Sequence, residues 1–142
     1  MAVSKKRKTL KVQEASARLR AAGLRPTRQR VALAQLLGGG HRHVSAESLH
    51  QEALKAGIPV ALATVYNTLN QFTEAGILRE VVVGSGRSYF DTNTDAHQHF
   101  YCDDDGSLAD IPGETIAVAG VPAPPKGMTV DRVEVVVRLK RG

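Results

Sequence analysis

The chain has 142 residues, of which 42% are apolar and 4% aromatic, with a formal net charge of +5 and one cysteine, Cys102. This length fits one domain or two small ones with aliphatic cores, and the apolar runs are too short for a membrane span or a signal peptide. The single cysteine excludes an internal disulfide, so we expect a cytoplasmic protein that does not associate with membranes.

Charge is divided unevenly along the chain. Residues 1–30 contain ten Lys and Arg and one acid, whereas residues 88–125 contain seven acids and no Lys or Arg. The basic part favours polyanions such as nucleic acid, and the acidic part favours cations. We expect residues 1–13 to form a disordered basic arm that adds phosphate contacts to DNA; a tail that only aids solubility is the alternative.

Three helices are predicted in the first part of the chain. The first spans residues 14–22, the second begins after Thr27 and runs to Leu37, and the third spans residues 46–56 after Ser45. Thr and Ser are preferred N-cap residues, and a glycine follows each of these helices. The apolar positions spaced to face a core are Val31, Leu33, Leu36 and Leu37 in the second helix and Leu49, Ala53 and Leu54 in the third.

Residues 62–76 predict a fourth helix with two different faces. Val65, Leu69 and Phe72 recur at helical spacing and form an apolar stripe for packing. The opposite face carries uncharged side chains that suit a groove lined with base edges. These side chains belong to Thr64, Tyr66, Asn67, Asn70 and Gln71. An ordinary amphipathic surface helix is the alternative interpretation.

A β-hairpin is predicted directly after the fourth helix. Residues 77–83 are mostly β-branched and apolar, residues 84–86 read Gly-Ser-Gly, and residues 87–91 return as a strand that begins at Arg87. Helices followed by such a hairpin indicate a winged helix-turn-helix domain, which we place at residues 14–91.

Positive charge collects around the start of the second helix. Arg25, Arg28 and Arg30 lie near its N-terminus, where charged side chains and backbone N–H groups both favour a phosphate. These three residues, together with Arg87 of the hairpin, are predicted to contact DNA.

The chain after residue 91 predicts a hinge and a second domain. The polar residues 92–97 form the hinge, and residues 98–142 form a small domain with a sheet. A sheet of this size buries little surface, so we expect two copies to pair through it as a homodimer. The expected elements are strands at residues 97–102, 108–111 and 131–140 and a short helix at residues 114–119.

The predicted fold class is therefore α+β. An N-terminal winged helix-turn-helix DNA-binding domain is followed by a small α/β domain for dimerisation and metal sensing.

Candidate metal ligands concentrate around the hinge. His97 and His99 alternate, so in a strand both imidazoles face one side, with Asp110 on the partner strand. Asp91 lies upstream, and His43 lies in a loop before the third helix. Imidazole and carboxylate ligands without thiolate suit Fe(II), Mn(II) or Zn(II), and the share of oxygen favours iron or manganese. Two exposed polar residues on a strand are the alternative interpretation of the His-x-His pattern.

Five short segments are informative as a set. They are residues 24–30 (LRPTRQR), 43–47 (HVSAE), 63–67 (ATVYN), 89–93 (YFDTN) and 97–99 (HQH). Together they resemble the ferric uptake regulator superfamily, and within it most closely the iron response regulators of alphaproteobacteria, which are related to the peroxide-sensing regulators. The resemblance covers about residues 14 to 140.

This resemblance implies roles for individual residues. The helix that contains residues 63–67 is the family's recognition helix, so Tyr66 is expected to touch thymine methyl groups and the DNA backbone, with Thr64 and Asn67 near the groove. The regulatory metal of the peroxide-sensing branch is held by three His and two Asp, and the matching residues are His43, Asp91, His97, His99 and Asp110.

The function implied is that of a metal-dependent, iron-responsive transcription regulator. We expect a repressor of iron homeostasis genes that binds an A·T-rich palindromic operator on double-stranded DNA as a homodimer. Fe(II) or Mn(II) is the expected ion, and Zn(II) is expected to bind in vitro. Peroxide sensing through metal-catalysed histidine oxidation is an alternative within the family.

Two of the departures from the family pattern bear on metal and haem binding. Many members hold a structural zinc with two Cys-x-x-Cys pairs, but Cys102 is alone, so no four-cysteine zinc is expected. Some iron response regulators bind haem through a Cys-Pro and three consecutive His. This chain has no Cys-Pro, and Gln98 separates its two His, which leaves haem ligation by His97 or His99 as a further alternative.

An enzyme and a passive DNA-binding protein are the remaining function classes. Histidines and carboxylates suit a metallohydrolase, but no nucleophile, second metal cluster or pocket-forming region is evident in the sequence, so we expect no enzyme. A DNA-bending protein without a sensor is expected to show little sequence preference and no ligand effect.

Overall fold

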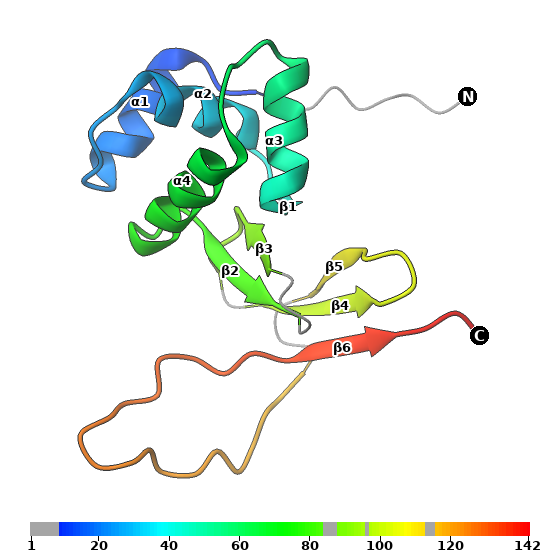
Figure 1. The fold of residues 1–142 in the computed structure, drawn as a ribbon. Helices are drawn as coiled ribbons and strands as arrows, with labels where there is room; N and C mark the ends of the chain where they lie inside the picture. Colours follow the sequence, from blue (N-terminus) through cyan, green and yellow to red (C-terminus); the bar gives the residue numbers. More distant parts are fainter. Residues whose placement is uncertain (1–8, 84–87, 96, 113–115) are drawn as a thin grey trace. The chain divides into compact units, whose positions relative to one another are not determined.

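The computed structural model describes residues 9–83, 88–95, 97–112 and 116–142 (Figure 1). The chain divides into two compact units, the first ending at Thr94 and the second running from Asp95 to Gly142. No helix in the described ranges combines the length and the apolar character needed to cross a bilayer.

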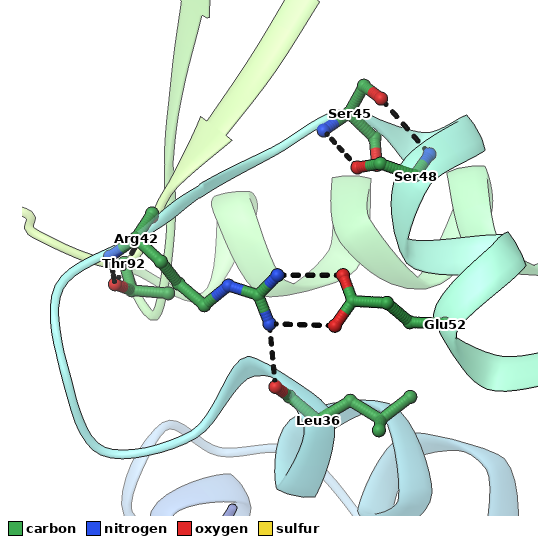
Figure 2. Close-up of polar contacts among 6 residues, drawn as sticks. All are labelled: Leu36, Arg42, Ser45, Ser48, Glu52 and Thr92. Atoms are coloured by element: carbon green, nitrogen blue, oxygen red, sulfur yellow. Dashed lines mark hydrogen bonds and ion pairs between the residues drawn. The ribbon is translucent and has the colours of Figure 1, made fainter. Parts of the chain in front are cut away.

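Four helices belong to the described part of the first unit: α1 (Val12–Ala21), α2 (Arg28–Leu37), α3 (Ala46–Lys55) and α4 (Leu62–Glu74). The four predicted helices are confirmed, with ends that differ by one or two residues. At the start of α2, Thr27 Oγ1 accepts a hydrogen bond from the Arg30 N–H at 3.3 Å. At the start of α3, Ser45 and Ser48 exchange backbone-to-side-chain bonds of 3.1 and 3.0 Å (Figure 2), so both predicted N-caps are confirmed.

The core of the first unit is built mainly from aliphatic side chains of the four helices. The predicted stripe of Val65, Leu69 and Phe72 on α4 is fully buried. The prediction that Leu54 is buried is wrong, because its side chain is 53% exposed. The buried residues of α3 are Ala46, Leu49 and Ala53, and a residue directly after Ala53 is rotated by about 100° away from that face.

A small antiparallel sheet completes the first unit, with β1 (His43–Val44), β2 (Arg79–Val82) and β3 (Ser88–Asp91) in the order β1-β3-β2. The hairpin of β2 and β3 confirms the predicted wing, although residues 84–87, its expected turn and Arg87, lie outside the described residues. The prediction that His43 lies in a loop is wrong. It pairs with Asp91 on β3, in a strand of two residues that is too short to show a periodic pattern.

The second unit contains a three-stranded sheet of β4 (Gln98–Cys102), β5 (Leu108–Ile111) and β6 (Val136–Leu139), in the order β5-β4-β6. Strand β4 runs antiparallel to β5 and parallel to β6. The expected strands at residues 97–102 and 108–111 are confirmed. Strand β6 is shorter than the predicted 131–140, because its ladder with β4 extends only from Val136 to Leu139.

The helix predicted at residues 114–119 is wrong in its described part. Residues 116–119 form no regular structure, and residues 114 and 115 lie outside the described residues. Pro112 and Pro122 bound this stretch, and a helix confined between them is too short to recover the cost of its first turn.

Phe72 provides a direct test of this packing. Phe72→Ala removes a fully buried ring and is expected to lower the free energy of unfolding by about 3–5 kcal/mol, measured by urea denaturation. The matched control is Asn70→Ala on the exposed face of α4, which is expected to change it by about 0.5 kcal/mol or less. Equal losses in the two variants would contradict the packing described here.

Candidate functional site

Three of the predicted metal ligands lie together in the second unit. Strand pairing places His99 opposite Asp110, and His97 comes directly before β4. The Nε2 atoms of His97 and His99 lie 3.2 and 3.4 Å from Asp110 Oδ1. Both imidazoles are buried, with 5% and 3% exposure, and their ring centroids are 4.5 Å apart. His97 lies just outside β4, and its ring and that of His99 still face one carboxylate, as the alternation of the two residues predicted.

The hydrogen bonding of His97 makes this cluster suitable for a cation. His97 Nδ1 lies 2.6 Å from the carbonyl oxygen of Asp95, which can only accept, so Nδ1 carries a proton. In the neutral ring Nε2 then presents a lone pair to the lone pairs of the Asp110 carboxylate. Two acceptors at this distance repel each other unless a proton or a metal ion lies between them.

The other two predicted ligands, His43 and Asp91, lie together in the first unit. The pairing of β1 with β3 sets them opposite each other, with His43 Nε2 3.1 Å from Asp91 Oδ2. The Asp91 carboxylate is buried, and its Oδ1 accepts a hydrogen bond from the Asn93 N–H at 2.8 Å. A buried carboxylate is costly without a positive partner, which either a protonated His43 or a metal ion provides.

Arg42 fixes the strand that carries His43 (Figure 2). Its guanidinium donates to both carboxylate oxygens of Glu52 on α3, at 3.1 and 2.7 Å, and to the carbonyl of Leu36 on α2 at 2.9 Å. Its backbone N–H donates to Thr92 Oγ1 at 2.8 Å, and the Thr92 N–H donates back to the Arg42 carbonyl at 3.0 Å. Arg42 comes directly before His43, and Thr92 comes directly after Asp91. The bonds of Arg42 therefore connect the neighbours of both predicted ligands to α2 and α3. Sequence reasoning missed this network.

The polar face of α4 is arranged as predicted. Tyr66 is 38% exposed, Asn67 is exposed and Thr64 is half-buried. The Tyr66 hydroxyl donates a hydrogen bond of 2.6 Å to Glu47 Oε1 on α3, a contact that the sequence did not predict. This bond lowers the pKa of Glu47 and raises the pKa of Tyr66, because it stabilises the carboxylate and the protonated phenol.

The predicted DNA-contacting arginines differ in what they contact. Arg25 and Arg28 are exposed near the start of α2. Arg30 donates through Nε and Nη2 to Gln71 Oε1 on α4, at 3.3 and 3.1 Å, and through Nη1 to the Arg25 carbonyl at 2.8 Å. Arg30 therefore links α2 to α4, a role that the charge pattern alone did not indicate. Arg87 lies outside the described residues.

The first unit combines four helices with a winged sheet, and a small sheet unit follows it in the chain. His and Asp residues in both units are suited to hold a metal ion. This combination is typical of metal-responsive, DNA-binding transcription regulators. The chain belongs to the ferric uptake regulator family, because the sequence model of this family matches residues 21–137. The predicted superfamily and the α+β fold class are therefore confirmed.

Individual relatives support this assignment. The chain is similar to the peroxide-responsive repressor PerR of Staphylococcus aureus, with 39% identity over 101 residues that cover 70% of this chain and 68% of the relative. It is also similar to the structure of the ferric uptake regulator from Pseudomonas aeruginosa with manganese, with 27% identity, a TM-score of 0.66 and coverage of 89% and 97% of the two chains. The Vibrio cholerae ferric uptake regulator matches with 26% identity, a TM-score of 0.71 and coverage of 89% and 98%.

The bond between Tyr66 and Glu47 predicts a change in titration. In Tyr66→Phe the pKa of Glu47 is expected to rise towards its ordinary value, because the hydrogen bond that stabilises the carboxylate is lost. Since folding lowers this pKa, the bond stabilises the fold at pH above the ordinary carboxyl value, and the contribution is lost as the pH falls through the lowered pKa. Carboxyl-carbon NMR titration measures the shift. Tyr101→Phe, in the second unit, is the matched control; an equal rise there, or no rise in Tyr66→Phe, would refute the contact.

Proposed function

We propose that this protein is an iron-responsive repressor of iron homeostasis genes that acts as a cytosolic homodimer on an A·T-rich palindromic operator. One regulatory ion is bound jointly by His43 and Asp91 of the first unit and by His97, His99 and Asp110 of the second. The observation that carries this proposal is the same in both units: an imidazole nitrogen faces a carboxylate oxygen at 3.1 to 3.4 Å. Such an arrangement needs a proton or a metal ion between the two atoms.

The connection between the units supports a shared ion. Asp91 and His97 are six residues apart in the sequence, so the chain between them spans at most about 20 Å. We propose that residues 92–97 act as the hinge between the two domains and that residues 98–142 form the dimer. An ion that takes ligands on both sides of a hinge restricts its angle, and in a dimer that angle sets the spacing of the two recognition helices.

The ligand set favours Fe(II) or Mn(II). Three imidazoles and two carboxylates match the preferences of these ions, and a related structure, that from Pseudomonas aeruginosa, contains manganese. Zn(II) is expected to bind the same residues in vitro. Cys102 is the single cysteine, so the chain does not supply four thiolates to one zinc ion. The ion supplies positive charge and fixed coordination, while the protein holds the ligands in place.

The proposed DNA contacts are those predicted from the sequence. Tyr66, Thr64 and Asn67 of α4 are proposed to face the bases, with the tyrosine ring against thymine methyl groups. Arg25 and Arg28 are proposed to contact phosphates, which adds affinity without sequence preference. Arg30 and Arg87 complete the proposed set, with Arg30 acting at least in part through its bond to Gln71.

Peroxide sensing is a second candidate, because the chain is 39% identical over 101 residues to a peroxide-responsive repressor. In this case iron bound by the same residues promotes oxidation of His97 or His99 by peroxide. Mass spectrometry of the peptide that contains both His, after peroxide treatment of the iron-loaded protein, is expected to show an added oxygen. An unmodified peptide in the iron-loaded sample would remove this candidate.

Metal titration coupled to DNA binding tests the main proposal. The affinity of the wild-type protein for a DNA duplex that it enriches from a random pool is expected to differ about 5- to 150-fold between Mn(II)-loaded and chelated protein. His99→Ala is expected to weaken Mn(II) binding at least about tenfold, by calorimetry, and to abolish this difference. His41→Ala, an exposed histidine outside both ligand groups, is the matched control. A metal effect that survives in His99→Ala would contradict the proposal.

A further inference from the structure

An acidic side chain lies on the surface that we propose for DNA binding. Glu47, in the first turn of α3, is exposed, and its Oε1 accepts the hydroxyl proton of Tyr66 at 2.6 Å. A carboxylate on a surface that approaches phosphates is unfavourable for binding, because like charges repel. Its presence beside the aromatic residue of the recognition helix therefore needs a reason.

The position of Glu47 is set by the fold. Ser45 and Ser48 close the first turn of α3 with reciprocal hydrogen bonds (Figure 2). Ala46 and Leu49, on either side of Glu47 in the sequence, are 1% and 0% exposed and lie in the same core as the apolar stripe of α4. The carboxylate is thus presented from a capped helix that packs on α4.

The bond to Glu47 changes what Tyr66 can offer to DNA. A phenol has one O–H donor, and here that donor is used by a carboxylate in a short, charge-assisted bond. At neutral pH the carboxylate is ionised and the phenol is protonated, and the bond moves the pKa of Glu47 down and the pKa of Tyr66 up, further from neutrality. The hydroxyl is therefore withheld from phosphate oxygens, and the ring is held in one orientation.

We propose that Glu47 is a specificity-determining residue for DNA binding. It positions the Tyr66 ring for apolar contact with thymine methyl groups and prevents the hydroxyl from making a sequence-independent bond to phosphate, at the cost of some general affinity. This inference rests on the proposed function of α4 as the recognition helix. An acid in the first turn also suits the helix dipole of α3, a purely structural role that affects stability and leaves sequence preference unchanged.

Relative affinity for two duplexes separates these roles. The first duplex is one that the wild-type protein enriches from a random pool with Mn(II), and the second contains only G·C pairs at equal length. Glu47→Ala is expected to weaken binding to the enriched duplex about fivefold or more, as the ring loses its orientation. It is expected to strengthen binding to the G·C duplex about threefold or more, as a negative charge is lost and the hydroxyl is released.

Three further variants complete the design. Glu47→Gln keeps an acceptor for the hydroxyl, so its ratio of the two affinities is expected to stay closer to that of the wild type than the ratio of Glu47→Ala. In the Tyr66→Phe background, Glu47→Ala is expected to strengthen binding to the G·C duplex less, because no hydroxyl is released. Glu74→Ala removes an exposed acid from the last turn of α4 and is expected to leave the ratio unchanged. Circular dichroism melting confirms that each variant is folded.

Each contrary result has a distinct meaning. An affinity ratio in Glu47→Ala within about twofold of the wild type overturns the inference, since one base contact changes affinity by about fivefold or more. An equal change in Glu74→Ala, or an unchanged effect of Glu47→Ala in the Tyr66→Phe background, also overturns it, because the effect then does not act through the tyrosine. Failure of the wild-type protein to enrich any duplex refutes the proposed function itself, and this inference with it.

Discussion

Two lone pairs that face each other at hydrogen-bonding distance need a proton or a metal ion between them, and in both units of the protein an imidazole nitrogen lies at this distance from a carboxylate oxygen. In the second unit the proton on His97 Nδ1 is held by the Asp95 carbonyl, so the other ring nitrogen faces Asp110 as an acceptor. In the first unit the buried carboxylate of Asp91 faces His43. Protons can satisfy either group alone. A single divalent cation that satisfies both would also couple the two units, which is the basis of the regulation proposed here.

Within the first unit, helix α3 makes polar contacts with the residue before His43 and with α4, the proposed recognition helix. Near its C-terminal end, Glu52 binds Arg42, the residue before His43. In its first turn, Glu47 binds Tyr66 of α4. One helix therefore contacts both the residue next to a proposed metal ligand and the side chain proposed to read the bases. The proposed coupling between metal occupancy and DNA recognition needs such an element, with polar contacts near both of its ends.

Much of this arrangement was predictable because it depends on local patterns. The helices follow from apolar spacing and N-cap residues, and the grouping of His97 with His99 follows from the alternation of a strand. The short strand of His43 was not predictable, because two residues carry no period. The bonds of Arg42 and Glu47 were missed for a different reason: each joins side chains from different elements whose proximity arises only after the helices pack. Propensity and spacing contain no information on such pairs.

The most direct test of the account is a crystal structure of the manganese-loaded protein, with the ion located by its anomalous scattering. The account predicts one regulatory Mn(II) per protomer, coordinated by His43 and Asp91 together with His97, His99 and Asp110. An ion coordinated by the second-unit residues alone, with His43 and Asp91 bonded only to each other, would contradict it.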